Sequence, residues 1–358
     1  ARLDAALIVD PRTVVKLEGS RIDVGIGATL IAEGRDGQEV IFTSHLDDRY
    51  GGSGTFDTNN DNALLQDEAI PEAGDWGGII AAPASTLGLD HVLITKAGGI
   101  TNSSGSFFAV NPIEIHQAEA RITNSVIEDN EVGQGGQAGA PDSTRFGLGF
   151  NRPAGIFIRG AQPIIVGNTI RMHQDLNRVD FDPTTTSPIP AISIDVDSLN
   201  ADLVRDYGRA TGRSDRFDGF RDNQGPLIHN NRLADNGING LVVRGETLTT
   251  QSVLDDTDIV HVVMDTIYVS DFHSYGGLRL ESNPTESLVV KFLSQDRSDN
   301  DPNVPNTAGL RAVGIPHEID DRIGGVVQVV GQPRSPVVLT SLNDDTVGAG
   351  FDPSGNVQ

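Results

Sequence analysis

Four segments of the chain share one register, and this register limits the fold more than any other feature of the sequence. The segments are LDHVLITKA, ITNSVIEDN, IVGNTIRMH and IHNNRLADN, which align an aliphatic column at Ile94, Ile127, Ile170 and Leu233. Three residues earlier, a column of turn-forming residues holds His91, Asn124, Gly167 and Asn230. A recurring apolar position next to a recurring turn predicts coils that stack and share one core, because no coil buries its apolar face alone.

The spacing between the aligned positions predicts long excursions from the coils. The aliphatic column advances by 33, 43 and 63 residues, which is more than one coil needs. We therefore expect loops at 133–151, 177–188 and 200–223, the last with a short helix at 201–207 (ADLVRDY). Loops on a rigid scaffold often carry function.

The fold class predicted is all-β: a right-handed parallel β-helix, or solenoid, with loop insertions. Few windows hold an apolar stripe of helical period, whereas short β-branched runs end at Gly, Asn, Asp or Pro. Asparagine in a turn tolerates left-handed backbone angles, and its amide can bond to the next coil. The 41 glycines and 18 prolines fit many turns between short strands.

A long internal repeat joins the two ends of the chain. The stretch VIFTSHLDDRYGG recurs as VVLTSLNDDTVGAG, and an offset of 297 residues pairs 34–48 with 331–345. A second pairing, 14–17 with 289–292, has an offset of 275, so the second copy carries an insertion. We predict one β-helix segment over 1–358: about one super-repeat over 1–295, then the insertion and the start of the next super-repeat over 296–358. On this hypothesis the chain is a fragment of a longer protein.

Charge and composition exclude several classes of partner. Acidic residues outnumber basic ones 50 to 26, for a net charge of −24, which argues against nucleic acid because that affinity comes largely from Lys and Arg. No apolar run approaches the ~20 residues of a membrane span. The absence of cysteine excludes disulfides and thiolate metal sites. Nothing at the N-terminus has the pattern of a signal peptide, so we expect a mature or excised piece.

The series FTSHLDDRYGG, an Asp/Asn loop and GDWGGI, with the later DDTDIVHV and YGGLRLES, resembles the β-helix repeat regions of large bacterial secreted or surface proteins. These belong to the wider pectate-lyase-like β-helix superfamily, which includes pectin-active lyases and hydrolases. The resemblance covers most of the chain. It implies export, to the extracellular space or the cell surface, and a solenoid. It names no substrate.

One loop has the oxygen spacing of a calcium site. In DTNNDNALLQDE, carboxylate or amide oxygens fall at positions 1, 3 and 5, a backbone carbonyl at 7 and a carboxylate at 12. The predicted ligands are Asp57, Asn59, Asp61, Ala63 and Glu68. Asn62 stands where glycine is usual, and the flanks are not helical. The alternative is an ordinary polar loop.

Two further features of the repeat have structural interpretations. The pair Asp47-Asp48 recurs as Asp344-Asp345, and carboxylates after a strand are typical caps of a turn. Trp76 lies between Asp75 and a glycine pair, where we expect a buried indole whose N–H bonds to a turn carbonyl.

Two strand-like runs in which charged and apolar residues alternate supply weak candidates for catalytic residues. Asp195 and Asp197 alternate with Ile192, Ile194 and Val196, which predicts an acidic pair on the outward face of a strand. Arg171 and His173 alternate in the same way one coil earlier and would supply basic neighbours. A charged solvent face is the favoured interpretation.

The function predicted is a non-catalytic, calcium-stabilised structural or adhesive module of an exported bacterial protein. The alternatives are a polysaccharide-active lyase or glycoside hydrolase and a glycan-binding module, both on the same fold. Poverty in aromatics, with one Trp and four Tyr, counts against both alternatives, since glycan clefts are usually aromatic. The predicted partners are neighbouring repeats of the same polypeptide, and a cell-surface glycan or protein.

Overall fold

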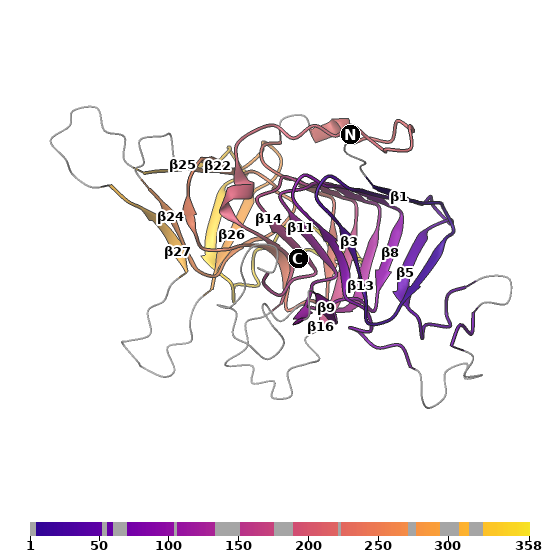
Figure 1. The fold of residues 1–358 in the computed structure, drawn as a ribbon. Helices are drawn as coiled ribbons and strands as arrows, with labels where there is room; N and C mark the ends of the chain where they lie inside the picture. Colours follow the sequence, from indigo (N-terminus) through magenta and orange to yellow (C-terminus); the bar gives the residue numbers. More distant parts are fainter. Residues whose placement is uncertain are drawn as a thin grey trace.

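In the residues that the structure describes, the regular secondary structure is almost entirely parallel β-strand, arranged in stacked sheets (Figure 1). The computed structural model describes residues 5–51, 56–59, 70–103, 106–132, 151–174, 189–220, 223–270, 277–293, 308–314 and 325–358. In these ranges every strand pair is parallel except the hairpin of β9 (Ile100–Ser103) and β10 (Ser106–Ala109). This arrangement is compatible with the predicted β-helix.

Three long sheets hold most of the strands. Sheet A contains β1 (Ala6–Val9), β4 (Thr29–Glu33), β7 (Thr86–Asp90), β12 (Glu119–Thr123), β15 (Ile164–Val166) and β18 (Leu227–His229). Sheet B contains β2 (Val14–Leu17), β5 (Val40–Ser44), β8 (Val92–Thr95), β13 (Val126–Glu131), β16 (Thr169–Gln174) and β19 (Arg232–Ala234). Sheet C contains β3 (Arg21–Val24), β6 (Gly78–Ala81), β11 (Ile113–His116), β14 (Ile156–Arg159), β17 (Pro190–Ile194), β20 (Ile238–Val243), β23 (His261–Val263), β26 (Leu288–Phe292) and β29 (Val337–Ser341).

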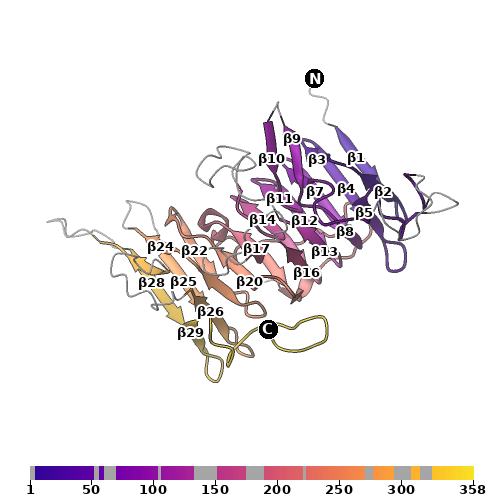
Figure 2. The same ribbon diagram turned by 90° about the horizontal axis from the view of Figure 1, so that it is seen from below.

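Two shorter sheets continue the stack beside the C-terminal part of sheet C. Sheet D contains β21 (Thr247–Leu248), β24 (Thr266–Val269) and β27 (Gly309–Ala312). Sheet E contains β22 (Gln251–Leu254), β25 (Gly277–Glu281) and β28 (Val326–Val330). The chain passes through A, B and C in turn up to β20 and through D, E and C afterwards, so each passage through three sheets is one coil. Figure 2 shows the coils running from the indigo N-terminal end to the yellow C-terminal end.

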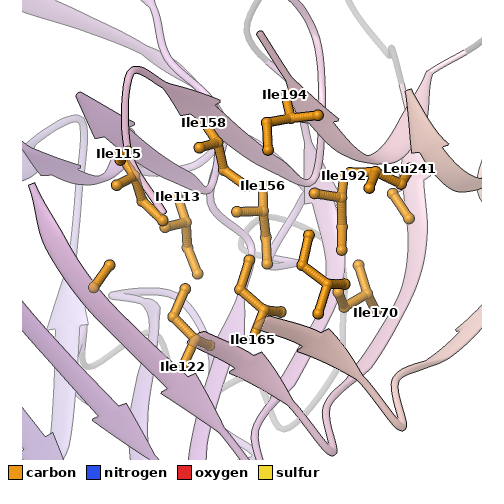
Figure 3. Close-up of a cluster of buried hydrophobic side chains, with 14 of the residues drawn as sticks. Ile113, Ile115, Ile122, Ile156, Ile158, Ile165, Ile170, Ile192, Ile194 and Leu241 are labelled. Carbon is orange, nitrogen blue, oxygen red and sulfur yellow. The ribbon is translucent and has the colours of Figure 1, made fainter. Parts of the chain in front are cut away.

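The predicted aliphatic column is confirmed. Ile94 pairs with Ile127, Ile127 with Ile170, and Ile170 with Leu233, all in sheet B. All four side chains are buried in the main apolar core. Figure 3 shows isoleucines of neighbouring coils, Ile170 of this column among them, pointing into one space between the sheets. Parallel strands lie ~4.8 Å apart, so identical positions pack directly on one another.

The predicted turn column also lies in register. His91, Asn124, Gly167 and Asn230 have φ values of 50°, 49°, 71° and 54°. Within the column, Asn124 Nδ2 donates to Asp90 Oδ1 in the preceding coil at 3.1 Å. The residues that follow the column also bond between coils: the amide of Ser125 donates to Asn168 Oδ1 at 2.9 Å, and the amide of Asn168 donates to Asn231 Oδ1 at 3.1 Å. The asparagine ladder of Asn168 and Asn231 therefore lies one residue after the predicted column.

The third predicted excursion is a strap, residues 200–220, that lies along the outside of sheet A. The helix predicted at 201–207 is wrong: the described helical turns are the short 3-10 segments η3 (Val196–Leu199) and η4 (Asp218–Phe220). Val204 and Phe217 pack on apolar residues of sheet A, and this tertiary contact overrides local helix propensity. The other two predicted loops, 133–151 and 177–188, lie almost wholly outside the described residues.

Buried ion pairs hold the strap on the coils. Arg121 of β12 donates from Nε to Asp206 Oδ1 at 2.9 Å. Arg209 donates from Nη2 to the carbonyl of Gly34 at 2.6 Å and lies 3.3 Å from Asp90. The strap thus reaches from the coil of β17 back to the coil of β4, and it links coils that are distant in the sequence.

The C-terminal segment, 342–358, folds back along the stack, as the yellow trace in Figure 2 shows. Leu342, Val347 and Ala349 pack on the outer face of sheet C. Phe351 pairs with Arg232, and Gln358 bonds to the carbonyl of Leu233, so the segment covers the free edge of β19. In the described ranges, no helix has the length and apolar character needed to cross a membrane.

Candidate functional site

The predicted calcium loop begins at an anchored corner of sheet B. Lys16 Nζ donates to the carbonyl of Phe56 at 2.7 Å, one residue before Asp57, and lies 3.8 Å from Asp48. Of the predicted ligands, Asp57 and Asn59 are described, whereas Asp61, Ala63 and Glu68 lie outside the described residues. In the part of the chain that the structure describes, no group of three or more His, Asp or Glu side chains converges as a metal site. Lys16 thus links the start of the loop to the acidic turn at Asp47-Asp48, and calcium binding stays a prediction.

The acidic turn before this loop is a cap, as predicted. Asp47 is fully buried and accepts bonds from Thr43 Oγ1 at 2.6 Å and from the amide and guanidinium of Arg49. Burial raises the pKa of Asp47, but the bonds from Arg49 and Thr43 outweigh burial and hold its pKa below the usual value. The last residue of β5, Ser44, donates from Oγ to a second carboxylate, Asp75, at 2.5 Å.

Trp76 has the structural role that we expected. Its side chain is fully buried, and its Nε1–H donates to the carbonyl of Thr95, at the end of β8, at 2.9 Å. The indole therefore belongs to the core and is not exposed for stacking on a sugar.

The acidic pair proposed for catalysis lies at the end of a strand. The strand β17 stops at Ile194, and Asp197 belongs to η3, so the predicted alternation ends there. Asp195 is buried and accepts bonds from the amide of Gly160 at 2.9 Å and from Ser198 Oγ at 2.5 Å. Asp197 accepts a bond from Thr249. Asp195 thus caps the turn of the neighbouring coil.

The basic candidates belong to a different sheet from the acidic pair. Arg171, on β16 of sheet B, pairs with Glu128 at 2.6 Å. His173 is buried, and burial lowers its pKa to about 3. A neutral, buried imidazole accepts no proton from solvent near pH 7. The four candidates therefore occupy two sheets, with the acidic pair at the end of a sheet C strand.

Sequence reasoning missed a buried polar row on the outer face of sheet C. His116 Nε2 lies 2.9 Å from Glu114 Oε2, and the amide of Asn111 donates to the same carboxylate at 3.0 Å. Burial raises the pKa of Glu114, but the contact with His116 outweighs it and lowers that pKa. Alternation in β11 was the available signal: Ile113 and Ile115 face the core, so Glu114 and His116 face outward.

An arginine that follows β20, three coils further on, continues this row. Arg244 lies over the ring of Phe157 at 4.4 Å and donates to Ser193 Oγ at 2.9 Å and to the carbonyl of Ile158 at 2.6 Å. Burial lowers the pKa of Arg244 to about 10, against the attraction of Asp195. The side chain stays charged at neutral pH, and it ties three strands of sheet C together.

A groove of about 640 Å³ follows the turn between sheets C and A. Three successive turns line it, at 84–86, 117–119 and 160–162, and η3 closes one end. The polar groups at its surface include Gln117, Glu119, Gln162 and Asp197, with no Lys or Arg in the lining. The arrangement suits a neutral or cationic polar ligand. It lacks the aromatic platform that commonly stacks on sugars.

Comparisons of the chain with protein-family models, with curated protein sequences and with solved structures found no match.

Proposed function

We propose that this chain is a non-catalytic structural or adhesive module of an exported bacterial surface or matrix protein, folded as a right-handed parallel β-helix. One observation carries the proposal: the strand-turn at 34–48 recurs at 331–345 with the same hydrogen bonds. Thr43 bonds to Asp47 and Thr340 bonds to Asp344, each at 2.6 Å. Repetition of a stacking unit lengthens a stalk, whereas repetition of an active site adds little.

The proposed partners are neighbouring repeats of the same polypeptide, with a cell-surface glycan or protein as an external partner. The net charge of −24 supports a well-solvated exterior rather than a nucleic-acid surface. Extracellular or cell-surface localisation belongs to the proposal, on the resemblance of the repeat motifs.

Calcium is the cofactor of this proposal, bound at the loop that starts at Asp57. The ion would supply positive charge among the closely spaced carboxylates of the loop, and calcium accepts 6–8 oxygen ligands. Binding to the folded chain alone raises stability with the logarithm of free calcium.

The calcium test is a pair of thermal unfolding curves, one in millimolar calcium and one in chelator. We expect calcium to raise the Tm of the parent, and the Asp57→Ala/Asp61→Ala double variant to lose that increase. Asp36→Ala, at an exposed turn, is the matched control and should keep it. An unchanged parent Tm would remove calcium from the proposal and leave the polar-loop interpretation.

A glycan-binding module is the second candidate, because the groove presents two amides, Gln117 and Gln162, beside two carboxylates. Incubation with a panel of acidic and neutral polysaccharides distinguishes the candidates. The structural proposal predicts no release of reducing or unsaturated ends. Release that is lost in Asp195→Asn would show an enzyme instead. Binding that is lost in Gln117→Ala would support the glycan-binding alternative.

A further inference from the structure

Among the described strands, β29 is the last of sheet C, and no described strand pairs with its outer edge. It pairs with β26 on one side and ends the sheet on the other. Apolar side chains of this end of the stack are exposed: Leu339 of β29 by 47% and Val329 of β28 by 52%. Figure 2 shows β28 and β29 at the end of the molecule opposite β1. An unpaired strand edge with apolar neighbours is a surface for strand addition.

The first copy of the repeat shows what covers the corresponding edge. There, β5 pairs with β2 on one side and with β8 on the other, with Phe42 opposite Ile94. The offset of 297 places Leu339 at the position of Phe42, which is fully buried. The same strand is therefore covered in one copy and open in the other.

The glycine at position 34 lies in close contact with the coil that covers the first copy. A Cβ on Gly34 would lie 2.4 Å from the carbonyl oxygen of His91, in the covering coil, and 2.9 Å from two atoms of its own turn. The amide of Gly34 donates to the carbonyl of Asp90 at 2.8 Å, and the amide of Val40 donates to the carbonyl of His91 at 3.1 Å. Glycine at 34 thus permits the close approach of the next coil.

The second copy keeps that glycine without the approach. A Cβ on Gly331 would meet only atoms of its own turn, at 3.3 Å from Val337 and 3.4 Å from Pro336. Neither Gly34 nor Gly331 has a positive φ, so conformation does not require glycine at either position. In the first copy the closest atom to that Cβ, at 2.4 Å, is the carbonyl oxygen of the next coil, and two atoms of the turn itself lie at 2.9 Å. The second copy retains the glycine although its own turn leaves more room there, at 3.3 Å.

We propose that the outer edge of β29 is a docking surface for a further coil of this repeat, with the chemistry of residues 90–95. The occupant presents a left-handed residue, like His91 with its φ of 50°, whose carbonyl faces Gly331. The strand that follows places an aliphatic side chain over Leu339. This inference rests on the proposed stacking function and identifies the strand edge on which a further coil of the repeat would stack.

The test is a fusion that keeps residues 1–358 intact and adds, through a flexible linker of about 20 Gly/Ser residues, a second copy of residues 74–132. Hydrogen exchange is measured at the amides of Gly331 and Val337. We expect at least tenfold slower exchange in the fusion than in the parent. Gly331→Ala should abolish this protection in the fusion and leave the parent's Tm unchanged. Gly25→Ala, which adds a Cβ in open space, is the control and should leave the protection unchanged.

Three results would overturn the proposal. One is unchanged exchange in the fusion. A second is protection that survives Gly331→Ala or an Ile→Asp change at the position of Ile94 in the added copy. A third is a dimer of the unmodified chain with protection at β29, which would assign the edge to a second molecule. The readout is independent of calcium and of polysaccharide binding, so failure here leaves the tests of the proposed function unaffected.

Discussion

The two copies of the repeated turn, 34–48 and 331–345, have the same local bonds in different surroundings. Both begin with a two-residue antiparallel bridge, Arg35 with Gln38 and Gln332 with Ser335. The copies belong to different sheets, β5 to sheet B and β29 to sheet C. The geometry of the turn is therefore determined by its own residues and not by the sheet that contains it.

One position of the turn has the same left-handed conformation in both copies, although it is glycine in only one of them. Gly37 has a φ of 68°, and the residue at the same place in the second copy, Arg334, has a φ of 74°. A left-handed residue other than Gly, Asn or Asp is uncommon. The bridge and the adjoining strand determine this conformation, and the side chain does not. What differs between the copies is burial, which depends on whether another coil lies above.

The largest expected difference between the copies is in the loss of stability when the equivalent apolar side chain, Phe42 or Leu339, is truncated to alanine. Phe42→Ala removes a fully buried ring and should lower the free energy of unfolding by about 3–5 kcal/mol. Leu339→Ala removes a half-exposed side chain and should cost less than about 1 kcal/mol. Chemical denaturation of both variants measures the difference. Equal costs would show that the two positions are buried alike in solution.

Removal of the capping carboxylate, Asp47 or Asp344, should give an intermediate difference in stability between the copies. Asp47→Ala leaves the buried hydroxyl of Thr43 and the exposed guanidinium of Arg49 without their acceptor and should lower the free energy of unfolding by about 1–3 kcal/mol. Asp344→Ala acts on a more exposed turn, so we expect faster amide exchange around Thr346 and little change in global stability. The adjacent carboxylates serve as controls: Asp48→Ala and Asp345→Ala should leave the turn bonds intact. A larger global loss from Asp344→Ala than from Asp47→Ala would contradict the comparison.

The smallest expected effect is the loss of stability at acid pH from protonation of Asp344. Hydrogen bonds from Thr340 and Thr346 lower the pKa of Asp344 to about 2, from an ordinary value of 3.8. Because the folded pKa lies below the unfolded one, the stabilisation is complete above about pH 4 and is lost as the pH falls toward 2. NMR titration of the Asp344 carboxyl should show a midpoint near 2, and Thr340→Val should raise it. A midpoint of 3.8 in the parent would mean that the turn is open in solution.

The features predicted correctly are those with a local or strictly periodic cause. The aliphatic column, the left-handed turn column, the Asp47 cap and the Trp76 contact each follow from residue type at a repeated position. The division at residue 295 and the calcium ligand set remain predictions. The structure describes only Asp57 and Asn59 of that set.

Errors arose where distant segments meet. The stretch 201–207 has helical propensity, but Val204 packs on sheet A and Leu203 forms a bridge with Gln224. The predicted strand through Asp195 and Asp197 ends because Asp195 accepts the amide of Gly160 in the neighbouring coil. Local patterns hold no information about such partners.

The sequence by itself determined the stacking register and the two copies of the turn, because side-chain period and turn chemistry act over a few residues. Only the tertiary structure decided which copy is covered and where the strap lies. It also decided that His173 is neutral and that Arg244 ties the strands of sheet C. Burial and ion pairing depend on residues that are tens to hundreds of positions apart, as with Arg209 and Asp90. That information appears only when the coils stack.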